Sequence, residues 1–191
     1  NYGYGNSYGN PAAAAYYNDS REKGFKTVFS AYAEATILPE KLKFKTSYNL
    51  DFYHYDLRSY TPEFNVGGSQ GNATSALSKT YGYGTYHIID NTLTYSDTKG
   101  AHSFSAMLGQ STRMQYNASL SGRANSVPGF DEQSKYLVNG SYKNQTTSDA
   151  ASRYNGLSFF ARGTYNYKDK YLATVTLRAD GSSKYQQKWG F

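Results

Sequence analysis

The side chains that most often catalyse reactions or bind metals are few in this chain, and their spacing matches no known site. The 191 residues include three histidines and no cysteine. His54, His87 and His102 have neither HxxxH nor HExxH spacing, and no GxSxG or P-loop motif accompanies them. We therefore expect no catalytic residue, no metal site and no cofactor. We interpret the histidines as exposed or interfacial side chains.

The carboxylates lead to the same expectation, which leaves non-covalent binding as the chemistry to look for. Asp149 has no partner at a spacing that would justify an acid/base pair, and we interpret the adjacent Asp131 and Glu132 as solvated loop charge. Aromatic side chains in polar stretches suit contact with sugar rings or peptides, because a flat apolar face ends in a polar tip. The candidates for ligand binding are Tyr60, Phe64, Tyr81, Tyr83 and Tyr136. For any single one of them, packing within a loop is the more common use.

The composition favours a particular kind of β-protein. Hydrophobic residues make up 38% of the chain and aromatic residues 17%, with 22 tyrosines. A disordered chain would lack the aromatics, and a soluble sandwich would carry more Val, Leu and Ile. A barrel wall needs only every second residue to be apolar and uses tyrosine at both membrane interfaces. The net charge of +6 comes from dispersed residues without a groove-reading motif, so we expect no nucleic-acid partner.

Alternation of apolar and polar residues with a period of two predicts β-strands in six segments. The clearest runs from 103 to 120, where Phe104, Ala106 and Leu108 alternate with small polar residues. Three arginines fall on the polar side of such segments. Because the polar side of a membrane barrel lines a wet lumen, we predict a lumen-facing position for Arg113, Arg162 and Arg178. The remaining segments span about 28–37, 42–52, 89–96, 157–167 and 171–180.

The spacing of these segments separates a barrel from a sandwich. Short turns at 38–41, 97–100 and 168–170 join the strands in pairs, and long polar stretches at about 58–84 and 122–153 separate the pairs. Bacterial barrels alternate short periplasmic turns with long extracellular loops, whereas sandwiches place turns about every 8–12 residues. The predicted fold class is all-β. It is an antiparallel transmembrane β-barrel segment of about six strands in three hairpins, part of a larger barrel.

The ends of the chain predict that it is an internal segment of a longer protein. It begins at Asn1 without a methionine or a signal peptide, and it stops at Phe191 directly after a Trp-Gly pair. The Tyr/Gly-rich opening at 1–10 and the alanines at 12–15 are predicted to end an extracellular loop. No stretch approaches the roughly 20 apolar residues that a spanning helix needs.

Three phrases in the sequence resemble a known family, in the family's own order. The run FARGTYNYKDKYLAT at 160–174 leads into LRADGSSKY at 177–185 and KWGF at 188–191. The others are HSFSAMLGQ at 102–110 and LKFKT at 42–46. Together they are similar to the barrel of SusC-like TonB-dependent outer-membrane transporters. Tyr185 stands where the family often has Phe, and Gln186-Gln187 replaces a Gly/Pro-containing loop, which leaves substrate choice open.

The resemblance implies a function that extends beyond these residues. Residues 1–191 would be part of a TonB-dependent receptor β-barrel domain, with the plug domain and the remaining strands absent from this chain. Family members import oligosaccharides or peptides across the outer membrane of the bacterial cell. Their partners are a SusD-like lipoprotein lid, the TonB complex, which acts through the plug region, and outer-membrane lipid.

Two other kinds of protein remain open at this stage. A passive porin or a surface adhesin could use the same barrel physics, and a plug domain encoded upstream would distinguish the importer from both. A secreted soluble glycan-binding β-protein is the third possibility. Such a sandwich should fold without detergent, whereas an arc of barrel wall exposes strand edges and a lipid-facing surface and should aggregate.

Overall fold

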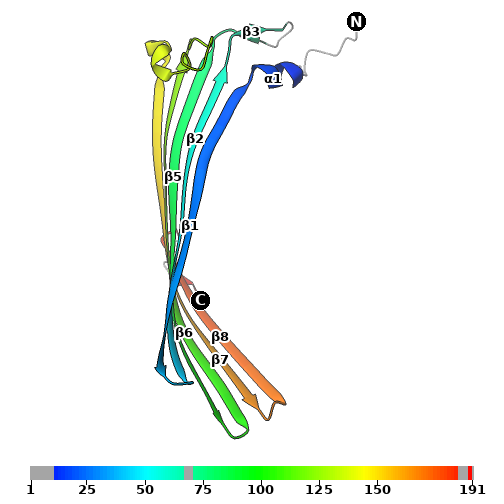
Figure 1. Cartoon of the computed structure of the whole chain (residues 1–191), viewed down its shortest axis with the longest axis vertical. Helices are drawn as coiled ribbons and strands as arrows, with labels where there is room; N and C mark the ends of the chain where they lie inside the picture. The colour runs from blue at the N-terminus through cyan, green and yellow to red at the C-terminus, as the bar shows by residue number, and fades with distance from the viewer. Residues whose placement is uncertain (1–10, 67–70, 185–188, 191) are drawn as a thin grey trace, which may run out of the picture. The chain divides into compact units, whose positions relative to one another are not determined.

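The structure, a computed structural model, describes residues 11–66, 71–184 and 189–190 and consists mainly of one antiparallel sheet (Figure 1). Neighbouring strands in the sheet follow the order β1-β2-β5-β6-β7-β8-β9, so each long strand pairs with the next along the chain. The six strands in three hairpins that the alternation predicts are thereby confirmed. The strands are β1 (Asp19–Leu38), β2 (Leu42–Thr61), β5 (Ala76–Lys99), β6 (His102–Asn125), β7 (Thr146–Tyr167), β8 (Tyr171–Ser182) and the short β9 (Trp189–Gly190).

Small elements occupy the connections. Strands β3 (Phe64–Asn65) and β4 (Gly71–Asn72) pair with each other between β2 and β5, and two single-turn 3-10 helices (Leu137–Asn139 and Tyr142–Asn144) lie between β6 and β7. Helix α1 (Pro11–Tyr17) holds the alanines that we expected in a loop, because alanine has the highest helix propensity and proline suits a first helical position. Within the described residues, no helix has the length and apolarity to cross a membrane.

Two expectations fall on residues outside the described part of the chain. The Tyr/Gly-rich opening at 1–10 is one of them. The other is the departure from the family pattern at Tyr185 and Gln186-Gln187.

The strands extend farther into the polar stretches than the sequence pattern indicated. The stretch predicted as a loop at 58–84 contains the last residues of β2, up to Thr61, and the first residues of β5, from Ala76. The stretch at 122–153 is likewise shortened, since β6 reaches Asn125 and β7 begins at Thr146. Backbone hydrogen bonding builds a ladder whatever the polarity of the side chains. At 24 residues, β5 and β6 are also longer than the roughly 9–11 residues that cross a bilayer.

The chain divides into two compact units, each made of segments from several strands. We call residues 1–25, 54–83 and 118–151 the loop-side unit, and residues 26–53, 84–117 and 152–191 the turn-side unit. The buried hydrophobic core lies in the loop-side unit, where Leu137 of the β6–β7 loop packs against it. The members of this core are Tyr60, Leu77, Ala124 and Val127.

In the turn-side unit the sheet has one apolar and one polar face. The register of β7 and β8 pairs Phe159 with Ala179 and Ala161 with Leu177 on the apolar face. It pairs Ser158 with Asp180 and Arg162 with Thr176 on the other. The apolar side chains are open to their surroundings rather than covered, with Leu108 62% exposed and Leu177 68% exposed. Such a face is stable next to lipid hydrocarbon.

Cross-strand pairs join the strands on both faces of this unit. On the polar face, Ser30 Oγ donates to Asn49 Oδ1 at 2.6 Å, and Ser96 Oγ donates to Ser105 Oγ at 3.0 Å. On the apolar face the Tyr95 and Phe104 rings lie 5.7 Å apart. Pairs of this kind contribute roughly 0.2–1 kcal/mol each to a sheet. Together they hold the register that keeps the two faces distinct.

The short turns place residues in the left-handed region of backbone conformation. Glu40 has φ = 60°, and Lys168 and Asp169 both have φ = 53°. Glycine adopts this conformation freely, and Gly100 does so in the β5–β6 turn with φ = 60°. A residue with a Cβ is strained there by roughly 1–2 kcal/mol. The β1–β2 and β7–β8 turns are therefore held by the sheet at a conformational cost.

We expect Glu40→Gly to raise the free energy of unfolding by about 0.5–1 kcal/mol, because the left-handed strain is removed while some unfolded-state entropy is gained. The denaturant midpoint of the intact receptor, refolded in detergent, measures the change. The matched control is Glu34→Gly within β1, which should lower stability because glycine weakens a strand interior. A midpoint lowered by both variants would contradict the strain argument.

Candidate functional site

The most ordered group on the polar face of the turn-side unit surrounds Arg178. Its Nε donates to both carboxylate oxygens of Asp180 at 2.9 Å, and its Nη2 donates to Ser158 Oγ at 3.2 Å. Ser158 is buried and donates in turn to Asp180. The guanidinium also lies 5.8 Å from the centre of the Phe160 ring, which covers Gly109. These contacts hold Arg178 close to the sheet while its side chain remains 45% exposed.

The other two predicted arginines share the polar face but are less constrained. Arg162 Nε lies 3.4 Å from Thr176 Oγ1, its cross-strand neighbour in the β7–β8 register. Arg113 is an odd-numbered residue of β6, like Ser103 and Ser105, and its side chain is exposed. All three predicted arginines thus lie on the hydrophilic side of the turn-side unit. Exposed guanidinium groups there can donate hydrogen bonds to carboxylate, carbonyl or hydroxyl oxygens.

The histidines are paired with aromatic rings. His87 Nδ1 lies 2.8 Å from the Tyr48 hydroxyl and His102 Nδ1 lies 2.6 Å from the Tyr165 hydroxyl. The His54 ring is stacked 5.7 Å from that of Phe25. Each pair is on a different part of the sheet, and within the described residues no group of three or more His, Asp or Glu side chains is placed to hold a metal ion.

The candidate ligand-binding aromatics occupy different environments in the loop-side unit. Tyr60 is 5% exposed in the core, and its hydroxyl donates to the carbonyl oxygen of Val127 at 3.2 Å. Its ring is therefore not offered to a ligand while the β6–β7 loop remains docked. The Phe64 ring is stacked on Tyr17 of α1 with the centroids 4.3 Å apart. These two rings contribute to packing in the folded chain.

The remaining three aromatics present their rings on the surface. Tyr81 is 46% exposed, Tyr83 44% and Tyr136 52%. Tyr81 and Tyr83 belong to β5 rather than to a loop, and Tyr136 belongs to the β6–β7 loop. Lys79 Nζ lies 4.3 Å from the centre of the Tyr136 ring, which is the geometry of a cation–π contact. The structure therefore brings Tyr81 and Tyr136 to one cleft, together with Lys79.

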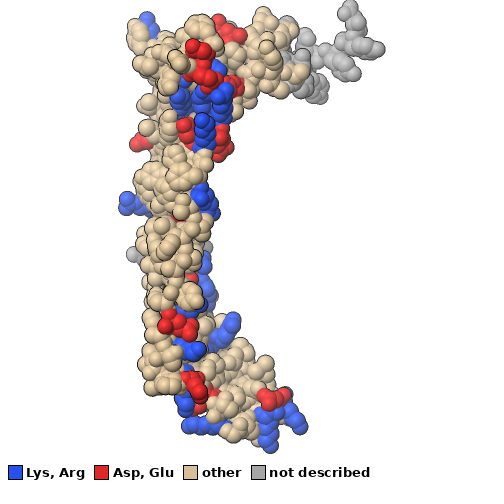
Figure 2. Space-filling model, in the orientation of Figure 1, with Lys and Arg blue, Asp and Glu red and all other residues tan. Residues whose placement is uncertain are grey.

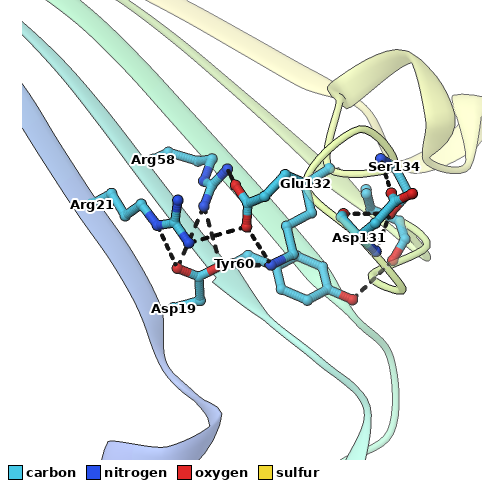
Figure 3. A network of polar contacts seen from close by, with 9 residues as sticks. Asp19, Arg21, Arg58, Tyr60, Asp131, Glu132 and Ser134 are labelled. Atoms are coloured by element: carbon cyan, nitrogen blue, oxygen red, sulfur yellow. Dashed lines mark hydrogen bonds and ion pairs between the residues drawn. The ribbon is translucent and has the colours of Figure 1, made fainter.

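A network of five charged residues in the loop-side unit binds the β6–β7 loop to the ends of β1 and β2 (Figure 3). Glu132 accepts hydrogen bonds from Arg58 and, at 3.1 Å, from Arg21. Asp19 accepts one from Lys135 at 2.7 Å and lies 3.2 Å from Arg58 Nη2. Figure 2 shows acidic and basic side chains gathered together in this unit. Three cations and two carboxylates thus hold one loop against two strands.

The charges in the loop titrate away from their ordinary ranges because of these contacts. Hydrogen bonds from Arg58 and Lys135 lower the pKa of Glu132 from 4.5 to about 2. The hydrogen bond to Asp19 raises the pKa of Lys135. Both side chains are therefore ionised across the physiological range. The Arg58 and Lys135 side chains are mostly shielded from solvent, at 15% and 12% exposed, whereas the Glu132 side chain is 49% exposed.

Asp131 and Glu132 are exposed loop residues, as the sequence interpretation had it, but both also have partners that it did not include. Glu132 joins the network just described, and Asp131 Oδ1 accepts a hydrogen bond from the backbone N–H of Ser134 at 2.7 Å, which shapes the loop. Glu132 lies 74 residues from Arg58 and 111 from Arg21 along the chain. A local sequence pattern carries no information about such distant partners. The Asp-x-x-Ser spacing was the only local signal.

We expect Glu132→Gln to loosen the β6–β7 loop, because it removes the carboxylate that binds Arg21, Arg58 and Lys135 together and leaves Asp19 to balance all three cations. Amide hydrogen exchange of residues 126–145 in the intact receptor measures the change, and exchange should become faster at pH 7. The control is Glu63→Gln, an exposed residue of the β2–β5 connection. Unchanged exchange in the Glu132 variant would show that the network does not hold the loop.

The same network predicts the direction of a pH dependence. Because folding lowers the pKa of Glu132 from 4.5 to about 2, its contribution to docking is complete above pH 4.5 and is lost as the pH falls towards 2. Loop exchange corrected for the intrinsic rate should accelerate in that window in the parent chain. The Glu132→Gln variant should lack that component.

The sequence of the chain is similar to those of known TonB-dependent receptors. No protein-family model matches the chain. It is 25% identical over 190 residues to TonB-dependent receptor P39 of Formosa agariphila, covering 95% of this chain and 17% of that protein. It is 28% identical over 148 residues to TonB-dependent receptor P3 of the same organism, covering 76% of this chain and 14% of that protein. The chain thus spans about one sixth of the relatives that it matches.

The fold is similar to that of solved transporters. The structure of the RagAB peptide transporter is similar to this chain with a TM-score of 0.82 at 15% sequence identity. The match covers 94% of this chain and 20% of the transporter chain. The RagAB peptide importer in the "open-open" state matches with a TM-score of 0.79 at 17% identity. At such identity the likeness establishes the fold, an arc of antiparallel barrel wall.

Sequence and fold agree in what they resemble. The sequence likeness covers nearly the whole chain, the sheet has the two opposite faces of a membrane barrel, and the fold matches that of a known transporter over the same length. These relatives are receptors and transporters rather than enzymes. The chain is thus similar in sequence to TonB-dependent receptors and has the fold of a stretch of transporter barrel wall.

Proposed function

We propose that this chain forms part of the wall of a TonB-energised importer that takes nutrients across the outer membrane. The observation that carries the proposal is its likeness to TonB-dependent receptor P39 over 95% of its length. Residues 1–191 are one part of the barrel domain, with a plug domain and further strands supplied elsewhere in the receptor. The short turns at the ends of the three hairpins face the periplasm, and the β2–β5 and β6–β7 loops face the outside.

The polar face of the sheet lines the path of the nutrient. Arg113, Arg162 and Arg178 carry positive charge along this face and can donate hydrogen bonds to passing cargo. The cargo class we propose is oligosaccharides or peptides, and the likeness in fold to the RagAB peptide transporter supports the second. Guanidinium groups suit the carboxylate and carbonyl oxygens of peptides. No covalent chemistry is required of any residue, so the function is transport without catalysis.

The loop end of the wall meets the partners on the outer side. Tyr81, Tyr83 and Tyr136 are the candidate aromatics for contact with cargo or with a SusD-like lipoprotein lid. These rings are about half exposed, which favours contact with something outside the chain. The TonB complex acts through the plug region and not through these strands. Outer-membrane lipid contacts the apolar face.

Energy dependence distinguishes an importer from a passive porin. In cells that carry the intact receptor, uptake of oligosaccharide or oligopeptide should fall to background when the proton-motive force is dissipated or TonB is deleted. Labelled cargo is counted inside the cells, and the amount of receptor at the surface is measured in parallel. Uptake that persists without TonB would replace the importer with a passive pore.

The role of the polar face can be tested with two arginines of the same strand. Arg162 and Arg153 are nine residues apart in β7 and therefore point to opposite faces, with Arg153 stacked 5.2 Å from the Tyr116 ring. We expect Arg162→Gln to lower the uptake rate several-fold, because a donor to the cargo is lost from the path. Arg153→Gln should leave the rate unchanged at equal surface level. Equal effects of both variants would count against a lumenal role for this face.

A further inference from the structure

A cleft of about 310 Å³ opens in the loop-side unit, beside the network that holds the β6–β7 loop. Its volume lies within the range of ligand pockets, roughly 300–1,000 Å³. Four basic residues line it, Arg21, Lys23, Arg58 and Lys79, against the two acidic residues Asp56 and Glu132. Four positive and two negative charges leave the lining at +2. The cleft is therefore suited to an anion.

The positive charges of this cleft are not equally neutralised. Arg21 and Arg58 are matched by Asp19 and Glu132 at the distances given above. Within the described part of the chain, neither Lys23 nor Lys79 forms an ion pair with a carboxylate. Lys79 contacts the Tyr136 ring instead, with its Nζ 4.3 Å from the ring centre. These two ammonium groups come from different strands, β1 and β5, and are available to bind the same negatively charged group.

The cleft lies on the side of the loop-side unit that carries Phe25, Tyr81 and Tyr83. Residues two apart on a strand point to the same side of the sheet. In β1 this places Lys23 on the same side as Phe25. In β5 it places Lys79, Tyr81 and Tyr83 on one side. The opposite side of β5 carries Thr80, which is hydrogen-bonded to Ser121 at 3.0 Å, and Gly82, which is covered by the Tyr55 ring. The odd-numbered series of β5 continues in the sequence with Thr85, His87, Ile89, Asn91 and Leu93, so it becomes more apolar towards the turn.

In a membrane barrel the apolar and aromatic face looks outward to lipid, and an aromatic girdle marks the membrane boundary. A cationic cleft directly beyond aromatic residues on that face is at the level of lipid headgroups rather than in the transport path. Basic residues in such a position attract anionic headgroups. The position of the cleft on the lipid-facing side, together with its positive charge, therefore favours an anionic lipid headgroup as the ligand.

We propose that this cleft binds a phosphate group of a phosphorylated glycolipid in the outer leaflet, with Lys23 and Lys79 as the ligating cations. The proposal rests on the orientation given under the proposed function, in which the loop end faces outward. Arg21 and Arg58 form the positively charged floor, held in place by Glu132. Tyr81 and Tyr136 border the cleft and can contact the sugar that carries the phosphate. The same lysines could take free phosphate, so the source must be distinguished by experiment.

The test uses the intact receptor, purified in detergent and depleted of lipid, and titrated by native mass spectrometry. The probes are bis-phosphorylated lipid A, lipid A with its phosphates removed, and inorganic phosphate. We expect the double variant Lys23→Gln/Lys79→Gln to raise the Kd for phosphorylated lipid A at least about tenfold, because two charge-assisted contacts are lost. The Lys23→Arg/Lys79→Arg variant keeps both charges and should bind like the parent.

The matched control changes two lysines of the β7–β8 turn, Lys168→Gln/Lys170→Gln. It removes the same charge and also includes a lysine beside an aromatic ring, since Lys168 Nζ lies 5.3 Å from the centre of the Tyr167 ring. Its affinity for phosphorylated lipid A should match that of the parent receptor. If the two double glutamine variants bind equally well, the cleft is not the site.

The other probes decide the source of the phosphate. The parent receptor should bind dephosphorylated lipid A at least about tenfold more weakly than the phosphorylated form, and millimolar inorganic phosphate should not displace the lipid. Equal binding of both lipid forms would overturn the phosphate contact, and displacement by inorganic phosphate would overturn the glycolipid as its source. The measurement is of binding alone. Uptake that proved independent of TonB would therefore refute the proposed function without altering this result.

Discussion

The antiparallel ladder is the constraint on which the rest of this structure depends. A backbone that crosses hydrocarbon must satisfy each N–H and C=O internally, and strands that pair with their neighbours in the sheet do so without help from side chains. The side chains are then free to divide between two faces. Phe159 and Leu177 on one side, and Arg162 and Asp180 on the other, follow from a single register. One geometric rule therefore builds both a lipid-facing surface and a hydrophilic surface.

The loop end is organised by a different interaction. There the β6–β7 loop covers part of the sheet, a small core forms around Leu77, and Arg58, Lys135 and Glu132 hold the loop in place. Ionic contacts shielded from solvent fix the positions of the charges next to them. The same network thus stabilises the loop and shapes the wall of the adjacent cationic cleft. In this unit the same residues stabilise the fold and line the binding surface. In the turn-side unit the lipid-facing and hydrophilic surfaces occupy opposite faces of the sheet.

Sequence reasoning located the strands well and their ends poorly. The alternation in 157–167 and 171–180 predicts the faces that the β7–β8 register shows, because a period of two is a direct consequence of strand geometry. The pattern begins β5 too late and ends β6 too early, since polar residues such as Lys79 and Thr80 look like loop residues when read locally. The alanines of α1 were misassigned for a related reason. A helix of seven residues is too short to give a periodic signal.

The sequence by itself determined the fold class, the three hairpins and the side of the sheet on which Arg113, Arg162 and Arg178 lie. These properties depend on neighbours within ten or twenty residues, and a local pattern can carry them. Only the tertiary structure decided that Tyr60 is a core residue, that Glu132 is bound by Arg21 and Arg58, and that Lys23 and Lys79 meet at one cleft. Those contacts join residues up to 111 positions apart, and they exist only when several strands pair in register.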